Sequence, residues 1–472
     1  MLMKRLWGLS IAIGWLFLSA PVGAEMPAEQ MFRLAYGLQQ NHNFSLARTQ
    51  WDKFIQAYPQ NVRAGDAQYL WAESWYTQGD YVRAAEGFRR VLEQYPQSQY
   101  LPEARYRLAR CLFQSERYVE AGRELRAFLM GYAENYLTPE AWYWLGESRY
   151  RQGNYTAASQ DFACVVERFP QHELAPIALY SEGRAYYDRA RAEAQGNSLT
   201  GAGRSVFEQA DALLAGFNQQ FPQSSLVADT LYYRAETLVV LERYPQALSL
   251  YDELYKRFPH HALAPYAVYG RGIVHLLQED PVGADKEFRQ LIDAYPTHAV
   301  IPLARLRLGQ ALARQEKFQP AVEELMTVAV RYPESPFVPR ALYTAGWCRM
   351  RENKDNEAIN LFQRLLDAEP SQDLAAQALF LVGNAFYRLE RYDSAGKAYR
   401  DLYGDYPDSV WAPAAMYWAG WCEFQLGKPD AALSEFERLL KNFPEHALAA
   451  EAHLRVGDAY FRLEKMTEAR RE

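Results

Sequence analysis

Beyond its first 24 residues the chain of 472 residues lacks any long apolar run. A helix that spans a bilayer needs about 20 apolar residues, so we expect no membrane span in the mature protein. The first residues differ, because a basic start precedes an apolar run from Leu6 to Leu18 and then the small residues Val22 and Ala24. This pattern is typical of a secretory signal peptide, residues 1–24, cleaved between Ala24 and Glu25. We therefore expect a soluble periplasmic protein; an uncleaved anchor is the alternative.

An excess of positive charge is also missing. The chain has 51 Lys and Arg against 58 Asp and Glu, a net charge of −7. Loss of Lys4 and Arg5 with the leader makes the mature charge more negative still. Because nucleic acids and anionic lipid surfaces attract basic patches, this balance argues against both as partners.

Catalytic and metal-binding motifs are absent as well. The sequence has no G-x-S-x-G, H-E-x-x-H, Walker loop or C-x-x-C. Four of the eight histidines each lie two residues after a recurring proline, where we expect turns: His172, His261, His298 and His446. The neighbouring acids Glu323 and Glu324 are expected on a solvated helix face. The sequence therefore predicts no enzyme, no metal site and no cofactor.

A repeated unit is present instead, and Thr138–Pro170 represents it. Trp142, Leu145 and Gly146 share one face of a predicted helix, and Ala158 and Phe162 share one face of a second. A turn at residues 153–154 joins them, and Pro170 ends the second helix. Neither helix can bury its apolar face alone, so copies must stack on both sides.

The copies recur at a fixed spacing along almost the whole chain. The alanine equivalent to Ala158 returns every 37 residues from Ala47 to Ala469, except for one step of 52 residues from Ala158 to Ala210. Small residues equivalent to Gly146, and a terminal proline in most units, keep the same register. The spacing predicts an all-α solenoid over residues 25–472, with eleven full repeats and a partial twelfth.

The W-x-x-L-G of Trp142, Leu145 and Gly146, with Ala158 and Pro170, resembles the tetratricopeptide repeat (TPR). A TPR solenoid is a right-handed superhelix whose first helices line the concave, ligand-binding side. This longer form is similar to the repeats of two bacterial envelope proteins. One is the TPR lipoprotein of the outer-membrane β-barrel assembly machinery; the other is the periplasmic TPR coordinator of the Tol–Pal system. Unlike the lipoprotein, this chain has no cysteine near the expected cleavage site.

The usual TPR has 34 residues, so each unit here carries three more. In Tyr332–Ala341 we expect Ser335 to cap the next helix and Pro336 to be its first residue. The added residues would then form roughly one more turn of the first helix.

Two irregularities and the four cysteines complete the pattern. The 15 extra residues of repeat five fall around residues 188–204, where we expect a longer first helix and then a tip at Gly196, Gly201 and Gly203. This insertion is either a protruding finger with arginines around it or a tolerated surface loop. The last repeat stops at Glu472, and we expect either a fragment of a longer protein or an end that meets a partner. The cysteines are expected to be buried thiols rather than disulfides.

Two stripes of aromatic residues, seven residues apart, run along the first helices and therefore face the same way. They either pack between helices or form a ligand-binding groove; Tyr suits a groove because it combines apolar area with a polar tip. The candidate binding residues are Tyr69, Tyr76, Tyr106, Tyr143, Tyr150, Tyr180, Tyr187, Tyr232, Tyr269, Tyr343, Trp347, Tyr387, Tyr417 and Trp421.

The exported leader, the repeats and the resemblance together predict a periplasmic scaffold for cell-envelope assembly or maintenance. Its expected partners are envelope proteins or their extended segments. The alternative is a protein that binds glycans, either peptidoglycan or an exported polysaccharide, because aromatic stripes also suit sugars.

Overall fold

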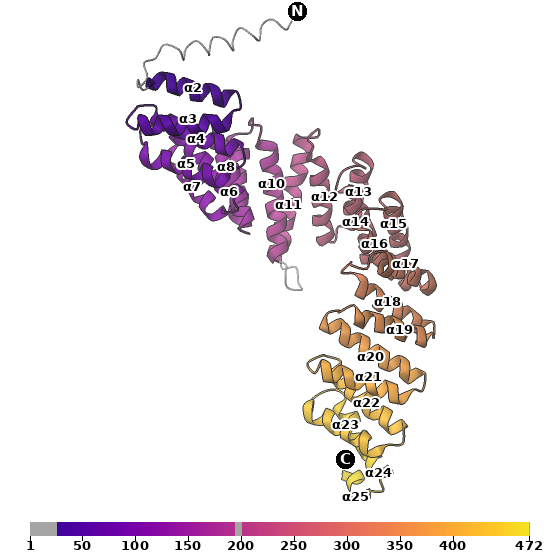
Figure 1. Ribbon diagram of the computed structural model, residues 1–472. Coiled ribbons are helices and arrows are strands. Elements are labelled where there is room, and N and C mark those ends of the chain that lie inside the picture. Colours follow the sequence, from indigo (N-terminus) through magenta and orange to yellow (C-terminus); the bar gives the residue numbers. More distant parts are fainter. Residues whose placement is uncertain (1–25, 194–200, 472) are drawn as a thin grey trace, which may run out of the picture. The chain divides into compact units, whose positions relative to one another are not determined.

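The computed structural model describes residues 26–193 and 201–471, so the expected cleavage site between Ala24 and Glu25 lies outside the described residues. Those ranges contain 24 helices and no strand (Figure 1). The expected all-α fold is confirmed. No described helix combines the length and the apolar character needed to cross a bilayer.

Most helices form pairs joined by short turns, and from residue 28 to 220 and again from residue 244 to 471 each helix packs on the next along the chain. The first eleven are α2 (Ala28–Gln40), α3 (Phe44–Ala57), α4 (Ala64–Thr77), α5 (Tyr81–Gln94), α6 (Leu101–Gln114), α7 (Tyr118–Gly131), α8 (Thr138–Arg151), α9 (Tyr155–Arg168), α10 (Ala175–Glu193), α11 (Gly201–Gln220) and α12 (Val227–Val240). The others are α13 (Tyr244–Arg257), α14 (Ala264–Leu277), α15 (Pro281–Ala294), α16 (Ile301–Arg314), α17 (Phe318–Arg331), α18 (Val338–Arg351), α19 (Asp355–Asp367), α20 (Gln372–Arg388), α21 (Tyr392–Asp405), α22 (Ala412–Gln425), α23 (Pro429–Asn442), α24 (Ala449–Arg462) and α25 (Met466–Arg471).

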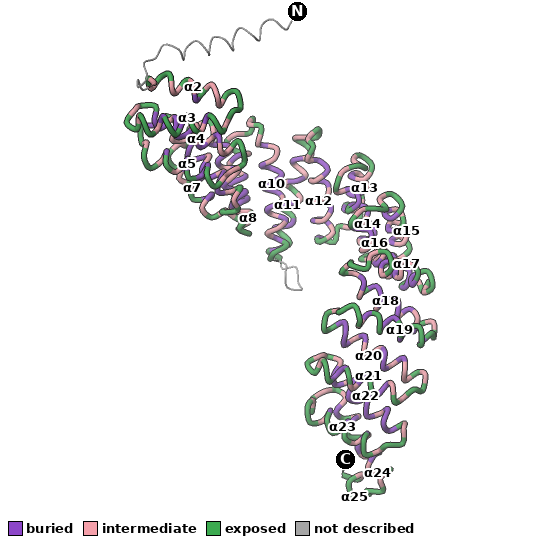
Figure 2. The backbone as a smooth tube through the Cα atoms, viewed as in Figure 1, coloured by how far each residue is buried: buried purple, intermediate pink, exposed green. Residues whose placement is uncertain are grey.

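The chain divides into two compact units, one up to Thr237 and one from Leu238 onward. The division falls within α12. In each unit every pair buries its apolar stripes against its neighbours, while the outward faces stay exposed (Figure 2).

The two helices of a pair approach closely because a small residue of the first faces a large residue of the second. A Cβ atom added to Gly146 would lie 2.7 Å from the ring of Phe162, and one added to Gly272 would lie 2.5 Å from the ring of Phe288. Both rings are fully buried. The recurrence of small residues at this position therefore follows from the close approach of the paired helices.

Replacing Gly272 by Ala tests this packing. The new methyl group would overlap a ring that cannot move without disturbing its neighbours, so we expect the substitution to lower the free energy of unfolding by about 1–3 kcal/mol. The matched control is Gly404→Ala in α21 of the same unit, where an added Cβ atom would meet nothing within 4 Å. Urea unfolding followed by circular dichroism measures both. Equal midpoints for the two variants would contradict the packing argument.

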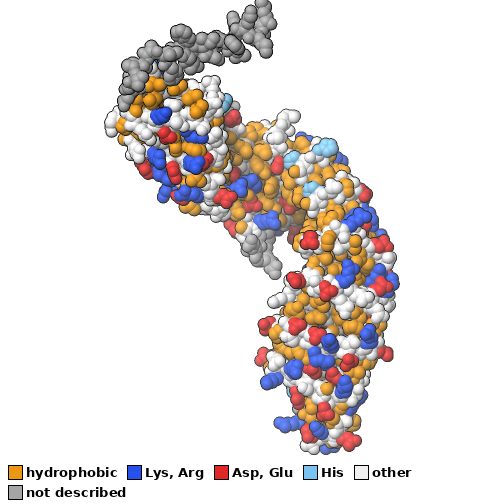
Figure 3. All heavy atoms as spheres, in the orientation of Figure 1, with side chains coloured by type: hydrophobic (Ala, Val, Ile, Leu, Met, Phe, Trp, Pro, Cys, Tyr) orange, Lys and Arg blue, Asp and Glu red, His pale blue; other side chains and the backbone are white. Residues whose placement is uncertain are grey.

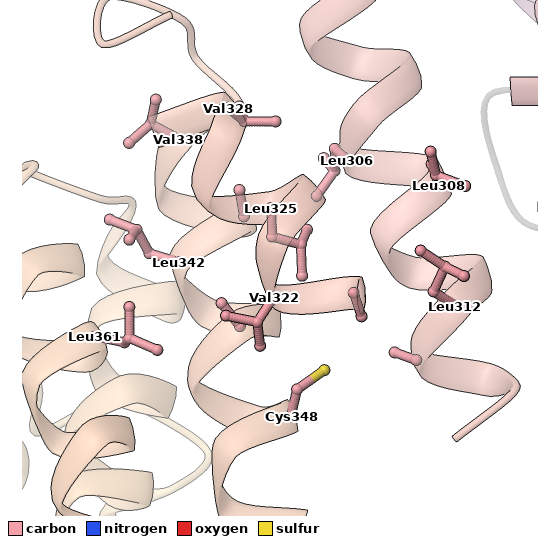
Figure 4. Packing of buried hydrophobic residues seen from close by; sticks show 14 of the residues in the cluster. Leu306, Leu308, Leu312, Val322, Leu325, Val328, Val338, Leu342, Cys348 and Leu361 are labelled. Atoms are coloured by element: carbon pink, nitrogen blue, oxygen red, sulfur yellow. The ribbon is translucent and has the colours of Figure 1, made fainter. Parts of the chain in front are cut away.

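One hydrophobic cluster of the second unit extends over several successive helix pairs. Figure 4 shows Leu306 and Leu312 of α16, Val322 and Leu325 of α17, and Cys348 of α18 in one cluster. Burial raises the pKa of the Cys348 thiol to about 12. All four cysteines are free thiols; Cys111, Cys348 and Cys422 are buried and Cys164 is half-buried.

The expected helix start at Ser335 and Pro336 is wrong. Helix α18 begins at Val338 with Phe337 as its N-cap, and it has 14 residues like most others. Ser335 instead joins two consecutive turns, because its amide donates to the Tyr332 carbonyl at 2.9 Å and its carbonyl accepts from Val338 at 3.1 Å. The added residues of the repeat thus lengthen the linker and not the helix.

The side chain at this linker position accepts a hydrogen bond from the backbone amide two residues later, as in other Asx and Ser turns. The four predicted turn histidines use their Nδ1 atoms in this way, with Nδ1 to amide distances of 3.2 Å. The position is filled by Asn61, Ser98, Asn135, His172, Ser224, His261, His298, Ser335, Ser409 and His446.

The insertion in repeat five lengthens both helices of its pair. Helix α10 has 19 residues, as its expected extension requires, and α11 has 20 residues. Gly201 and Gly203 belong to α11, and Gly203 is buried, so the expectation that both lie in the tip is wrong. Gly196 lies outside the described residues. Val206 and Phe207 are among the buried residues of α11, so the apolar face of this helix extends into its first two turns.

Candidate functional site

The aromatic residues of the first predicted stripe lie mainly in the core. Tyr143 is 8% exposed, and its ring centroid lies 5.6 Å from that of Phe162 in the paired helix. Burial raises the pKa of Tyr143 to about 12. The buried members are Tyr69, Tyr106, Tyr143, Tyr180 and Tyr417, and the half-buried ones are Tyr232, Tyr269 and Tyr343.

The second stripe lies nearer the surface, and its polar ends are bonded to neighbouring first helices. The Tyr150 hydroxyl donates to Asp188, and Trp421 Nε1 donates to the Tyr387 hydroxyl at 2.8 Å. The Arg107 guanidinium lies 4.7 Å from the ring centre of Tyr76. In this stripe Tyr187 is buried, and Tyr76, Tyr150 and Tyr387 are half-buried. The two tryptophans predicted to add to the groove, Trp347 and Trp421, are half-buried as well.

One hollow brings two of the predicted residues together on the first helices of the second unit. Its volume is about 410 Å³, and α14, α16 and α18 supply its walls. These first helices also contact one another directly, α16 with α18. We call this hollow the arginine pocket; it is lined by Leu276, Arg307, Gln310, Ala313, Arg314, Arg340, Tyr343, Thr344 and Trp347.

The arginine pocket contains three cationic side chains and no acidic one. In the part of the chain that the structure describes, Arg307, Arg314 and Arg340 have no carboxylate within ion-pair distance. Arg307 donates to Gln310 at 3.0 Å and to the Tyr269 hydroxyl at 3.4 Å, while Arg314 and Arg340 are exposed.

Other arginines of the same helices have acidic partners. Arg349 of α18 pairs with Glu352 at 2.6 Å. Arg305 of α16 pairs with Glu324, which also lies 3.8 Å from Arg289. The expectation that Glu324 is only solvated is therefore wrong, since arginines from two neighbouring helices lie against it. The arginines of the pocket therefore differ from Arg305 and Arg349, because they have no carboxylate partner in the described part of the chain. Their guanidinium groups can donate hydrogen bonds to an anion that binds from outside.

On the face of the molecule drawn in Figure 3, acidic and basic side chains are interspersed. Within the described ranges, no three His, Cys, Asp or Glu side chains gather in a way that could hold a metal ion.

Family models for the tetratricopeptide repeat match residues 232–299, 306–373, 343–410 and 419–472, and another matches residues 140–172. Together they cover more than half of the chain. The chain belongs to the tetratricopeptide-repeat family. A model of an outer membrane lipoprotein family matches residues 24–129 and 69–151.

Several solved structures are similar to the chain at low sequence identity. A TPR protein from Parabacteroides merdae is 14% identical, with a TM-score of 0.38 over 60% of this chain and 98% of that one. The C-terminal part of a TPR protein from Cytophaga hutchinsonii is 16% identical, with a TM-score of 0.44 over 58% and 98% of the two chains. Yeast Tom70 is 12% identical, with a TM-score of 0.37 over 93% and 96%. No curated protein matches the chain.

The arginine pocket includes Tyr343 of the first aromatic stripe and Trp347, which was predicted to add to the groove, but its three arginines are not among the predicted residues. A signal for them was present. Helices α16 and α18 each contain three arginines and no acidic residue, although the whole chain is acidic. Arg307 and Arg314 are also seven residues apart, so they lie on one face of α16.

Proposed function

We propose that this TPR protein is a periplasmic scaffold for cell-envelope assembly or maintenance, and that the arginine pocket binds extended acidic segments of envelope proteins. The arrangement of Arg307, Arg314 and Arg340 around Tyr343 and Trp347 carries the proposal. The match to an outer membrane lipoprotein family and the leader expected from the sequence support an envelope location.

The proposed binding is recognition without chemistry. Guanidinium groups form charge-assisted hydrogen bonds with carboxylates, which are the stronger kind of hydrogen bond and can be bidentate. Tyr343 and Trp347 supply rigid apolar area beside them, against which an apolar side chain of the same segment packs. A volume of about 410 Å³ holds a few side chains and not a folded domain, which favours an extended segment.

Photocrosslinking in the host bacterium tests this function. The crosslinking amino acid p-benzoylphenylalanine replaces Thr344 inside the arginine pocket or, as a control, exposed Arg331 on α17. We expect adducts with envelope proteins, recovered from the periplasmic fraction, at position 344 and few at position 331.

The crosslinked peptides should map to acidic segments. Adducts with cytoplasmic proteins alone, or equal adducts at both positions, would count against the proposal. An adduct that survives protease digestion but not glycosidases would favour the glycan alternative instead.

A further inference from the structure

A second pocket lies within the first unit, between α10 and α11 of the enlarged repeat five. Its volume is about 370 Å³. It is lined by Leu179, Glu182, Tyr186, Gln209, Ala212, Leu213, Gly216 and Gln220. The walls are largely apolar, and Glu182 is the one charged residue among them.

Glu182 is only 9% exposed, and in the described part of the chain its carboxylate has no hydrogen-bond or ion-pair partner. A largely buried carboxylate without a partner is costly, because it loses part of its hydration and gains no ion pair in return. The burial accordingly raises the pKa of Glu182 to about 7, and the neighbouring Glu167 of α9 adds to the shift.

In the next two repeats, the position of Glu182 also carries a charged side chain, and there the charge has a partner of opposite sign. Arg234 and Arg271 stand where repeat five has Glu182. Arg234 lies 2.9 Å from Asp211, and Arg271 lies 2.7 Å from Glu287. Both arginines therefore have an acidic partner supplied by a packed helix, whereas no basic partner is supplied to Glu182.

The pocket leaves room for such a partner. A Cβ atom added to Gly216, on the pocket wall, would meet nothing within 4 Å. Leu179, Ala212 and Leu213 provide apolar surface for an alkyl chain, and Glu182 provides the anion. Lysine and arginine side chains combine these two properties, since they bury an alkyl stem and carry a cationic head.

We infer that this pocket, which we call the Glu182 pocket, receives a lysine or arginine side chain of a partner protein, with the cationic head against the Glu182 carboxylate. The site goes beyond the proposed function, because it lies in the first unit and selects the opposite charge from the arginine pocket. A partner with basic and acidic segments would have two distinct contacts on this scaffold.

Saturation-transfer NMR with small probes tests the inference on the full chain. The probes are n-butylammonium and n-butylguanidinium, which represent the two side chains, and n-butanol as a neutral control. We expect saturable binding of both cations and much weaker binding of butanol. Glu182→Gln keeps the shape of the side chain and removes its charge, so cation binding should weaken at least about tenfold, as loss of a charged hydrogen bond implies.

A second variant blocks the space and keeps the charge. Gly216→Leu places its side chain where no atom stands, so it should abolish cation binding without disturbing the core. Cation binding that is unchanged in Glu182→Gln, butanol binding as strong as that of butylammonium, or no saturable binding to the wild type would each overturn the inference.

Binding at the Glu182 pocket can be tested independently of binding at the arginine pocket. Glu182→Gln should leave the binding of an acidic peptide at the arginine pocket unchanged, and charge reversal at Arg314 and Arg340 should leave butylammonium binding unchanged. Failure of one site therefore does not imply failure of the other.

Discussion

Reversing the charges of Arg314 and Arg340 is expected to weaken the binding of an acidic peptide about 100-fold. Each arginine would otherwise form a charged hydrogen bond, and such bonds contribute about 1.5–3 kcal/mol each. Both side chains are exposed and lack ion-pair partners in the described part of the chain, so the double variant Arg314→Glu/Arg340→Glu should fold normally. Fluorescence anisotropy with a labelled peptide of Asp, Glu and one Phe measures the affinity.

The control is Arg331→Glu/Arg364→Glu, which changes the net charge equally but alters exposed residues of α17 and α19. We expect this variant to bind within about threefold of the wild type at physiological salt, where charges more than about 8 Å away are screened. A peptide with Asn and Gln in place of the acids should bind no better to the wild type than to the double variant. Equal losses in both charge variants would indicate general electrostatics and contradict a specific pocket.

Replacing Glu182 by Gln is expected to stabilise the protein, and more so as the pH rises. The pKa of Glu182 is about 7 in the folded chain against an ordinary 4.5, because burial disfavours the charged form of the carboxyl group. The folded state therefore loses stability as the pH rises from about 4.5 to about 7, and this loss then levels off. At pH 8 it amounts to on the order of 3 kcal/mol, and at pH 5 to less than about 1 kcal/mol.

Urea unfolding at pH 5 and pH 8 measures the difference between the variant and the wild type. Glu173→Gln serves as the control, because it removes the same charge from an exposed residue in the linker before α10. Its effect should be within about 0.5 kcal/mol of zero at both pH values. A Glu182→Gln variant no more stable than the wild type at pH 8 would show that the carboxylate is compensated within the chain.

The repeated helix pair was predictable because its sequence signals are direct consequences of packing. Gly146 and Ala158 are small where the two helices meet, and the 37-residue spacing repeats that requirement. The start of α18 was harder to place, since Ser335 and Pro336 suit a turn as well as a helix start. The turn prevails because the Ser335 side chain and carbonyl both accept from backbone amides in the linker.

The two pockets were less accessible to sequence reasoning. The aromatic pattern predicted Tyr343 from a stripe and Trp347 as an addition to the groove, but it also predicted residues such as Tyr143, which contacts Phe162 in the core. Spacing alone cannot separate these cases, because burial depends on how far each ring extends beyond its neighbours. Glu182 was easier to notice in the sequence, since it stands 37 residues after Leu145, at the position that Leu145 occupies in the unit Thr138–Pro170. A charged residue at a core position is informative only when its partners are also known.

A crystal structure of the full chain with the acidic peptide tests the central claim most directly. The account predicts an extended peptide on the first helices of the second unit, with carboxylate oxygens within hydrogen-bond distance of Arg314 and Arg340 and an apolar side chain against Trp347. A peptide bound at another face, or an arginine pocket left empty at saturating peptide, would contradict it.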